Sequence, residues 1–543
     1  MSRFGLIFAV VLASSAAAAT ASARGICEDL EVVATTGQQA ADLPEGIVYQ
    51  GFVDFDLNDR GQMTFRAFLS GDGVTFHDDG ADFLAEGGTA RLVARDGDQA
   101  AGLPPGIIYQ GLSCFHCDLP PIAGPRINNA GRVVFTTLLD DRRFNPLGAG
   151  EGMFSDVGSR AIDLVVRSGD FLPLEAGAVR IQHLPIEPGR VLLAETGDVA
   201  LVVGVSGLEP LDLPPTAILT GRPGAPGRLA VVAHSGRQAP DLPEGLIYRS
   251  LTLLGLTTRG GVIFSGGVTD VMDPRSPVEL DLFGGRRDHP RLLVRQGDRA
   301  PGLPDGVILR DLGRFSHHGV RANRRGDLAI TAGLDGPGIV EGDNDSAIFV
   351  GSPDSLELLV QRGDQAAGFP PGTFYTRLFP AVMNNRGRVA FPASVDTSSG
   401  SGTGDDAIFS DVAGALDVVV REGDQVPGEA EGTTFGQPGC CGRAFDVLQI
   451  DDAGRILFEA AIADGSSRRG PFLAGPDGQI LPLLRPGDPI VLGDGTVRTV
   501  VRIGHVELTA KGWIGVHVGF HQDFHPQALL VGRADCKGAS RRR

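Results

Sequence analysis

Several residue types are scarce in this sequence, and each shortage excludes something. The 543 residues include one tryptophan, four tyrosines and only two lysines, Lys511 and Lys537. With a formal net charge of −18, the chain lacks the basic stripe that binding to nucleic acid or an anionic membrane requires. The single Trp513 and the few tyrosines also argue against an aromatic platform for sugar rings, although phenylalanine can substitute.

Long hydrophobic runs are missing as well, apart from the start of the chain. Arg3 is followed by an apolar stretch over residues 4–13 and by the small residues Ala-Ser-Ala at 21–23. This order is typical of a secretory signal peptide that is removed after Ala23. A membrane anchor is the alternative, but the stretch is shorter than the roughly 20 apolar residues that cross a bilayer. We therefore expect a mature chain with no membrane span, secreted, periplasmic or at a bacterial cell surface.

Glycine and proline are abundant instead, and many of the glycines recur in a fixed pattern. The same spacing is found in NDRGQMTF (58–65), NNAGRVVF (128–135), NNRGRVAF (384–391) and DDAGRILF (451–458). An Asn, Asp or Thr three residues before a glycine is typical of a type I turn closed by a residue with positive φ. Glycine suits that last position because a Cβ makes positive φ costly. A structural turn is predicted at Asn58, Gly61, Asn128, Gly131, Asn323, Gly326, Asn384, Gly387, Asp451 and Gly454.

A second stretch recurs between these turns. Its clearest copies are RDGDQAAGLPPG (95–106), RQGDRAPGLPDG (295–306), QRGDQAAGFPPG (361–372) and REGDQVPG (421–428). Counted through its glycine, from Gly37 to Gly487, it occurs eight times at an average period of about 64 residues. Each period therefore supplies one supersecondary unit of a repeat architecture.

One copy of the repeat reads as four short strands, at 374–383, 388–395, 406–412 and 416–424. Four antiparallel strands repeated eight times predict an all-β fold, an eight-bladed β-propeller. Pro392 interrupts the second strand, so it must occupy a bulge or a position without a ladder bond. An open solenoid of the same units is the alternative.

The two ends of the chain supply complementary parts of one blade. The last copy contributes three strands, at 496–508, 513–520 and 527–533, and an orphan fourth strand lies at 30–38. Joining them closes the ring and leaves no open sheet edge. The N-terminal strand is therefore predicted to complete the last blade.

This organisation defines three segments. Residues 1–23 are predicted to be the signal peptide, 24–536 a single propeller domain and 537–543 a disordered basic tail.

The six cysteines fall at the closure and in two insertions. Closing the ring should bring Cys27 beside Cys536, and we predict a disulfide between them. For the others a disulfide of unknown pairing is favoured in an oxidising compartment, with a zinc site or free thiols as alternatives. These are Cys114, Cys117, Cys440 and Cys441.

The repeated motifs resemble a known family. NDRGQMTF, NNAGRVVF and NNRGRVAF, with the REGDQVPG-like stretches between them, are similar to the tandem-repeat NxxGxxxF family of exported bacterial proteins, the choice-of-anchor group. The resemblance covers nearly all of the mature chain and implies an exported repeat protein of undetermined role. It carries over no catalytic residue. Members typically end in an anchoring segment, which this sequence does not show.

Three groups of residues are candidates for metal or ligand binding. The first is the aspartate of the Gly-Asp pair, which either binds cations on one face or bonds to the backbone of its own loop; the second role is favoured. These residues are Asp98, Asp170, Asp298, Asp364, Asp424 and Asp488. The second group either forms a transition-metal site or belongs to a solvated polar loop. It consists of His505, His517, His521, Asp523 and His525.

The third group consists of two loops rich in glycine and aspartate, at 335–349 and 400–409. Such loops can hold calcium, but neither has the spacing of a known calcium motif, and ordinary connections are favoured. We expect no catalytic residue and no metal or other cofactor, with calcium as the one alternative. The sequence has no GxSxG, no HExxH and no phosphate-binding loop.

The function expected from these observations is binding or structural. The chain is interpreted as an exported propeller that acts as a scaffold for an extracellular protein or glycan, without catalysis. A hydrolase or lyase acting on carbohydrate is the alternative. An enzyme should show carboxylates or histidines converging at the central channel, and a scaffold should show apolar or small residues there.

Overall fold

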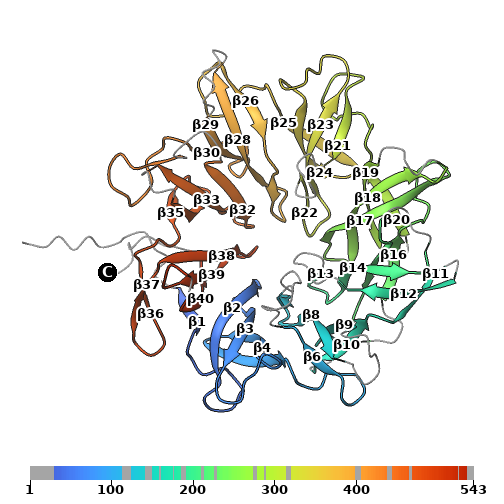
Figure 1. The fold of residues 1–543 in the computed structure, drawn as a ribbon. Coiled ribbons are helices and arrows are strands. Elements are labelled where there is room, and N and C mark those ends of the chain that lie inside the picture. Colours follow the sequence, from blue (N-terminus) through green and yellow to red (C-terminus); the bar gives the residue numbers. More distant parts are fainter. Residues whose placement is uncertain are drawn as a thin grey trace, which may run out of the picture.

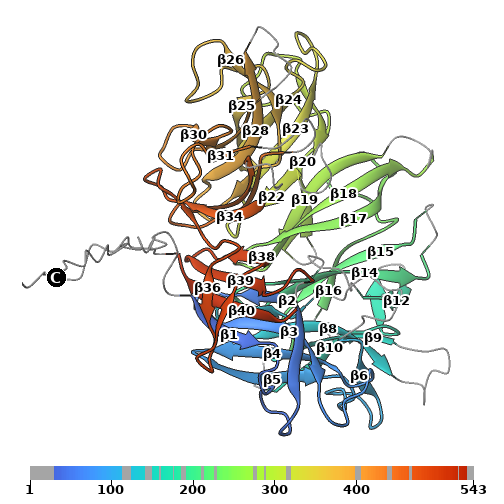
Figure 2. The same ribbon diagram turned by 60° about the vertical axis from the view of Figure 1, so that its left-hand side comes forward.

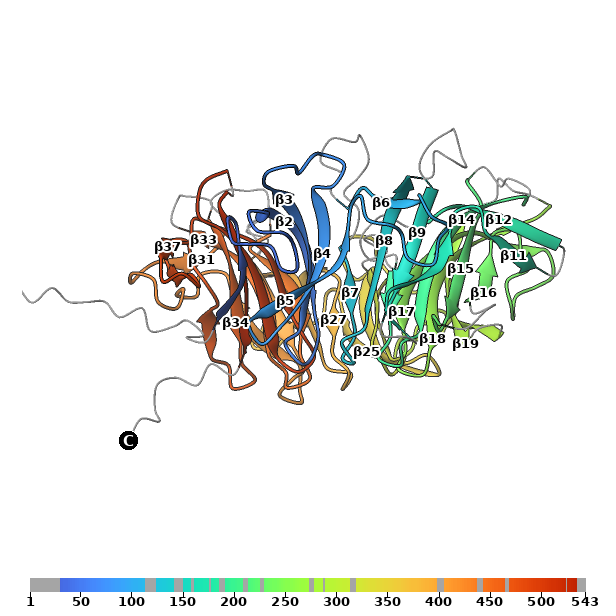
Figure 3. The same ribbon diagram turned by 90° about the horizontal axis from the view of Figure 1, so that it is seen from below.

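The structure is a computed structural model that describes residues 30–112, 124–140, 150–157, 161–174, 177–184, 191–208, 213–224, 229–272, 278–286, 289–312, 319–397, 405–436, 443–463, 468–523 and 525–534. Every element assigned within these residues is a β-strand. The strands form eight antiparallel sheets around a ring and one separate hairpin (Figure 1). Seen from the side, the sheets stand next to one another around the ring (Figure 3). The predicted eight-bladed β-propeller is confirmed. In the described part of the chain, no helix is long and apolar enough to cross a membrane.

The first four blades follow one another along the chain. Blade 1 contains β2 (Val48–Leu57), β3 (Met63–Ser70), β4 (Gly80–Glu86) and β5 (Thr89–Arg95). Blade 2 contains β6 (Ile108–Gln110), β7 (Arg126–Ile127), β8 (Val133–Asp140), β9 (Gly150–Ser155) and β10 (Asp163–Arg167). Blade 3 contains β11 (Phe171–Leu174), β12 (Gly177–His183), β13 (Val191–Leu193), β14 (Val199–Ser206), β15 (Thr216–Gly221) and β16 (Leu229–His234). Blade 4 contains β17 (Leu246–Leu256), β18 (Gly261–Asp270), β19 (Glu279–Arg286) and β20 (His289–Val294).

The other four blades complete the ring. Blade 5 contains β21 (Ile308–Leu312), β22 (Val320–Ala322), β23 (Leu328–Asp335), β24 (Ser346–Ser352) and β25 (Ser355–Gln361). Blade 6 contains β26 (Thr373–Leu378), β27 (Val382–Met383), β28 (Val389–Thr397), β29 (Asp405–Ser410) and β30 (Asp417–Arg421). Blade 7 contains β31 (Thr434–Phe435), β32 (Phe445–Ile450), β33 (Ile456–Ala463), β34 (Arg469–Ala474) and β35 (Ile480–Pro482). After the hairpin of β36 (Pro489–Val491) and β37 (Val497–Thr499), blade 8 contains β38 (Arg502–Leu508), β39 (Trp513–Gly519), β40 (Gln527–Arg533) and β1 (Glu31–Thr35).

The innermost strand of several blades differs from the prediction. It was expected to be continuous, as at 374–383, but in blade 6 it is divided into β26 and β27, which both pair with β28. The expected strand at 496–508 is also wrong in its first part, because β37 pairs with β36 outside the blade and only β38 joins blade 8.

Pro392 lies opposite the division in blade 6. Its carbonyl accepts a hydrogen bond from the N–H of Phe379, at 3.2 Å, in the gap between β26 and β27. The nitrogen of Pro392 faces the same gap, because the N–H and C=O of one strand residue point the same way. The missing N–H therefore removes no ladder bond, as predicted.

The phenylalanine that ends the repeated motif is a core residue. In five blades it stacks on a phenylalanine of the third strand, with ring centroids 5.3–5.7 Å apart and planes 19–23° apart. These contacts combine large apolar burial with a favourable offset ring geometry. The pairs are Phe65–Phe83, Phe135–Phe154, Phe264–Phe283, Phe391–Phe409 and Phe458–Phe472.

The ring is closed by the two ends of the chain. β1 pairs with β40, with Glu31 opposite Val531 and Thr35 opposite Ala528, so an N-terminal strand completes the C-terminal blade (Figure 2). The predicted closure is confirmed. Cys27 and Cys536 lie outside the described residues, and so do the other four cysteines.

Each repeated turn is closed within its own blade as predicted. In blade 1, the side-chain Oδ1 of Asn58 accepts hydrogen bonds from the N–H of Arg60 and of Gln62, both at 3.0 Å. The N–H of Gly61 donates to the carbonyl of Asn58, at 3.0 Å, and Gly61 has φ of 80°. The glycine is required there because a Cβ would also meet the ring of Trp513, 2.7 Å away.

The same asparagine also links its blade to the next one. Asn58 Nδ2 donates to the carbonyl of Asn128 at 2.8 Å, and Asn384 Nδ2 donates to that of Asp451 at 2.8 Å. The N–H of Lys511 in blade 8 donates to Asp59 of blade 1, which carries the linkage across the closure. Related bonds join Asn128 to Ala194 and Asn323 to Asn384. The repeated turns therefore build a belt of hydrogen bonds around most of the ring axis.

Candidate functional site

The aspartates of the Gly-Asp loops have the backbone role that was favoured for them. Five of these carboxylates accept a hydrogen bond from the backbone N–H three residues earlier, at 2.7–3.0 Å. This contact closes each loop locally, so the carboxylates are not directed at a shared cation. The five are Asp170, Asp298, Asp364, Asp424 and Asp488.

The histidines near the end of the chain do not form one ligand set. His521 Nδ1 lies 2.7 Å from Asp523 Oδ1, and both side chains are exposed. His517 is buried, with Nε2 3.2 Å from Gln527 Oε1, and burial lowers its pKa to about 4. His525 lies near the amide of Gln527 instead. Among the described residues, no group of three or more His, Cys, Asp or Glu is placed to hold a metal ion.

The two Gly/Asp-rich loops also behave as ordinary connections where the structure describes them. In the first, Asn344 Oδ1 accepts from the N–H of Val340 at 2.7 Å, and its Nδ2 donates to the carbonyl of Gly338. Residues 400–404 of the second loop lie outside the described residues.

The strongest concentration of functional groups lies on the innermost strands. We define the axial position of a blade as the residue two places before its turn residue. Four of the eight axial positions are charged, although this part of the strand faces the ring axis. In blade order they are Asp56, Arg126, Leu192, Gly255, Arg321, Val382, Gln449 and Glu507.

Three of the charged axial residues belong to adjacent blades. Arg126 of blade 2 lies 3.5 Å from Asp54 and 3.9 Å from Asp56 of blade 1, measured between guanidinium nitrogens and carboxylate oxygens. Its side chain is 23% exposed, so the pair is reached by solvent. Asp56 also accepts a hydrogen bond from the N–H of Ile127, at 2.7 Å. The carboxylates therefore hold blade 2 against blade 1.

Glu507 of blade 8 completes this group. Burial, followed by the negative charge of Asp56, raises the pKa of Glu507 well above its usual value, and Arg126 only partly offsets this. Burial also raises the pKa of Asp56. The Oε2 atom of Glu507 is buried without a hydrogen-bond partner. Glu507 therefore keeps its proton to a higher pH than an ordinary carboxyl does.

His505 extends the group along β38. It is exposed, and its ring meets the ring of Phe55 edge-on at 4.8 Å. Together these residues bring three carboxyls, one guanidinium and one imidazole onto the innermost strands of three adjacent blades. We call them the axial cluster, which consists of Asp54, Asp56, Arg126, His505 and Glu507.

The turns close the ring axis at one end. Arg324 of blade 5 places Nη1 2.8 Å from Glu195 of blade 3 and 3.3 Å from Asp59 of blade 1. Asn129 of blade 2 donates to the same Asp59 at 2.7 Å. Turns from non-adjacent blades therefore meet at the axis on this face.

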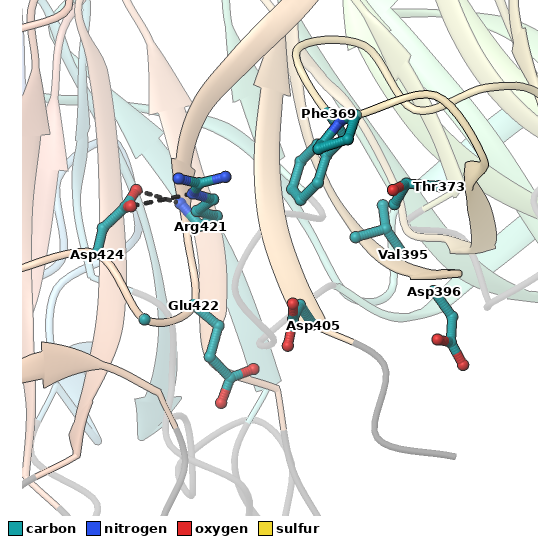
Figure 4. Close-up of a pocket in the computed structure, with 10 residues that line it drawn as sticks. Phe369, Thr373, Val395, Asp396, Asp405, Arg421, Glu422 and Asp424 are labelled. Carbon is teal, nitrogen blue, oxygen red and sulfur yellow. Dashed lines mark hydrogen bonds and ion pairs between the residues drawn. The ribbon is translucent and has the colours of Figure 1, made fainter. Parts of the chain in front are cut away.

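One cavity lies beside a Gly-Asp loop of blade 6, and another lies between blades 1 and 8. The larger, of about 540 Å³, is lined in blade 6 by Phe369, Asp396, Asp405 and further residues (Figure 4). Two of its charged groups are already engaged, because Asp424 pairs with Arg421 at 3.1 Å and accepts from its N–H (Figure 4). These contacts fold the Gly-Asp loop of blade 6.

The smaller cavity, of about 240 Å³, lies between blades 1 and 8. Gln527 forms part of its wall, and its Oε1 accepts from the N–H of Phe52 at 2.7 Å as well as facing His517. A Cβ on Gly51 would approach His525 to 3.0 Å, so this wall is closely packed. The lining residues are Gln50, Gly51, Phe52, Phe68, Asp79, His525 and Gln527.

Sequence reasoning missed most of the axial cluster. It singled out His505 but grouped it with the wrong histidines, and it made no prediction for Asp54, Asp56, Arg126 or Glu507. Aligning the copies on their turn residue reveals the signal, because charged residues then share a position that is apolar or small in other copies. That pattern is visible only after the copies are aligned.

Comparison with known protein families places the chain in a family whose function is unknown. The model described as Family of unknown function (DUF7453) matches residues 8–142 and 119–520. No curated protein matches the sequence. The resemblance to the NxxGxxxF repeat family stays a prediction.

Solved structures share only the type of fold. The β-propeller domain of the Trilobed protease from Pyrococcus furiosus is 8% identical, with a TM-score of 0.37 over 81% of this chain and 99% of that chain. An acylaminoacyl peptidase from Pyrococcus horikoshii is 10% identical, with a TM-score of 0.38 over 87% and 57%. An alpha-L-arabinanase from Penicillium chrysogenum is 11% identical, with a TM-score of 0.27 over 64% and 94%.

Proposed function

We propose that this chain, which belongs to the Family of unknown function DUF7453, is an exported β-propeller that binds a glycan at the axial cluster without catalysing a reaction. The observation that supports this most is the gathering of Asp54, Asp56, Arg126, His505 and Glu507 on the innermost strands of three adjacent blades. Such groups donate and accept the hydrogen bonds that sugar hydroxyls need.

Binding is favoured over catalysis because the carboxylates are held by the backbone. Asp56 accepts from the N–H of Ile127, and Asp54 accepts from that of Gly124 at 3.2 Å. Both also lie beside Arg126. Carboxylates fixed in this way form a rigid, pre-organised surface, which lowers the entropic cost of binding.

The direction of approach follows from the closed turn face. Arg324 and its partners occupy the axis at that end. A ligand would therefore reach the axial cluster from the face of the Gly-Asp loops. The net charge of −18 and the scarcity of lysine disfavour an extended polyanionic surface such as nucleic acid or an anionic membrane.

Calorimetric titration of the purified protein tests this proposal, with trigalacturonate as an acidic glycan and cellotriose and chitotriose as neutral ones. Asp56→Asn should weaken binding about tenfold, since a charge-assisted hydrogen bond is lost. Glu357→Gln is the control, because this exposed residue lies on the outer strand β25. Unchanged affinity in the Asp56 variant would contradict a site at the axial cluster.

A carbohydrate hydrolase or lyase is the second candidate, and one observation favours it. Glu507 keeps its proton at higher pH than an ordinary carboxyl, and Asp56 lies close by as the more ionised partner. One carboxylic acid beside one carboxylate is the pair that glycoside cleavage uses. If the chain were such an enzyme, Glu507→Gln would abolish release of reducing ends from a bound glycan while leaving its binding intact.

A further inference from the structure

Arg321 occupies the axial position of blade 5, on the innermost strand β22 (Figure 1). Its neighbours Val320 and Ala322 pack into the core shared with blade 4, where Val320 is 4% exposed and contacts the group that contains Ile263. Successive strand residues point to opposite faces, so Arg321 projects away from that core. It is half-buried there rather than fully hydrated.

This arginine lacks the partners that Arg126 has at the same position. Arg126 faces two carboxylates from the preceding blade. In the blade that precedes Arg321, the axial position is Gly255, which offers no side chain. Among the described residues, the side chain of Arg321 donates one hydrogen bond, from Nη1 to the carbonyl of Val320 at 3.4 Å.

A half-buried guanidinium without a carboxylate is unfavourable in the free protein. Burial lowers the pKa of Arg321, which shows that its surroundings oppose the charge. A guanidinium remains charged at any physiological pH, so an anion that binds it relieves this cost most directly. The planar fork of N–H groups matches a carboxylate or a sulfate.

The opposite wall of the ring is close enough for one ligand to touch both sides. Arg324, three residues after Arg321 on the same blade, reaches Asp59 of blade 1 within 3.3 Å. Near this end of the axis, the two walls are therefore separated by little more than one extended side chain. A short chain of sugars that contacts Asp56 would lie within reach of Arg321.

We infer that Arg321 binds the anionic group of the ligand, and that the ligand is an acidic glycan carrying a carboxylate or a sulfate. This inference rests on the proposed function, since it assumes a glycan at the axial cluster. It adds the chemical class of that glycan and assigns its recognition to one residue outside the cluster. The hydroxyls of the sugar then face the axial cluster while its acid group faces Arg321.

The test compares Arg321→Gln with Arg325→Gln, an exposed arginine in the adjoining turn. Calorimetric titration uses trigalacturonate, a sulfated trisaccharide, cellotriose and triglutamate. We expect an acidic trisaccharide to bind more tightly than cellotriose, Arg321→Gln to weaken it at least tenfold, and Arg325→Gln to bind like the wild type. The carboxylate and sulfate probes tell which anion the site prefers.

The other outcomes separate this inference from the proposed function. If a glycan binds and Asp56→Asn weakens its binding while Arg321→Gln does not, the proposed site at the axial cluster is supported and the role of Arg321 is overturned. Tighter binding of cellotriose than of either acidic probe overturns it in the same way. If triglutamate binds more tightly than every glycan and Arg321→Gln weakens that binding, the ligand is an acidic peptide and the proposal of a glycan ligand is overturned. No binding of any probe overturns both proposals.

A second measurement guards against an effect on folding. Removing an uncompensated charge should raise the melting temperature of the unliganded protein, because the residue is unfavourable without its ligand. A lower melting temperature of Arg321→Gln would show that Arg321 supports the fold, which contradicts the inference.

Discussion

Arg126 and Arg321 occupy the same position in two blades of one ring, yet their surroundings differ completely. Arg126 pairs with Asp54 and Asp56 of the preceding blade, while the blade that precedes Arg321 has Gly255 at the corresponding position. In a repeat protein, the surroundings of a residue can be compared with those of the residue at the same position in another copy. The comparison teaches that a charged residue links adjacent blades where the neighbouring copy supplies its partner, while a residue without such a partner is, in our proposal, the one that meets the acid group of the ligand.

The difference extends to the blades around them. On blades 8, 1 and 2, charges and histidines bond to one another and to the backbone of the next blade. On blades 3, 4 and 6 the axial positions are Leu192, Gly255 and Val382. The converging groups expected of an enzyme and the small or apolar groups expected of a scaffold are therefore both present, on different parts of one ring.

The largest expected effect is a loss of folding stability in acid, which arises from His517 of blade 8. The pKa of His517 is about 4 in the folded chain and about 6.5 when exposed, so the unfolded state binds the proton first. The contribution of His517 to stability should be constant above pH 7 and fall by about 3 kcal/mol between pH 6.5 and pH 4. Urea unfolding across this range measures it. His517→Gln should remove the fall, and the exposed His521→Gln should not; equal slopes in both variants would contradict the assignment.

The next effect comes from removing the partner that Arg126 provides. Arg126→Met leaves Asp54 and Asp56 close together without a cation. Breaking a buried pair costs about 3–5 kcal/mol, and solvent at this half-exposed site reduces our expectation to about 2 kcal/mol. Chemical denaturation checks this, and adding Asp56→Asn to the variant should restore part of the loss. A double variant less stable than the single one would count against charge as the cause.

A smaller effect is expected from giving Arg321 the partner that it lacks. Gly255→Asp copies Asp56 into blade 4, and Gly255→Asn has nearly the same shape without the charge. Both must displace Ala322 slightly, since a Cβ would lie 3.0 Å from its Cβ. The Asp variant should exceed the Asn variant by about 1 kcal/mol in stability at pH 7. Equal denaturation midpoints would show that a carboxylate at position 255 does not stabilise the guanidinium of Arg321.

The smallest effect concerns Glu507. Its raised pKa means that the folded state holds a proton that the unfolded state releases above its ordinary pKa. Stability therefore falls as the pH rises from about 4.5 through the raised pKa, and Glu507→Gln should flatten this fall. Denaturation at pH 5 and pH 8 measures the difference. A steeper loss in the variant would reverse the sign and refute the assignment.

The fold was predictable because the same local sequence patterns repeat along the chain. The glycine of each turn requires a positive φ, and the phenylalanine of the motif alternates with outward residues on a core strand. The closure by β1 followed from counting strands at the two ends. The division of the inner strand at Pro392 was only half predictable, because the sequence shows the missing N–H but not the gap that tolerates it.

The axial cluster was not predictable in the same way. Glu507 and Asp56 lie near opposite ends of the chain and meet only because the ring closes between blades 8 and 1. The belt of hydrogen bonds has the same origin, since the partner of Asn58 is the carbonyl of Asn128 in the following blade. Interactions between copies depend on how the copies stack, which the pattern within one copy does not contain.

The most direct test of this account compares the melting temperatures of Arg126→Met and Arg321→Met with that of the unliganded wild type. The same substitution at the same position of two blades should act in opposite directions, lowering the melting temperature at Arg126 and raising it at Arg321. A similar decrease in both variants would contradict the central claim that one arginine holds the ring together and the other is kept for a ligand.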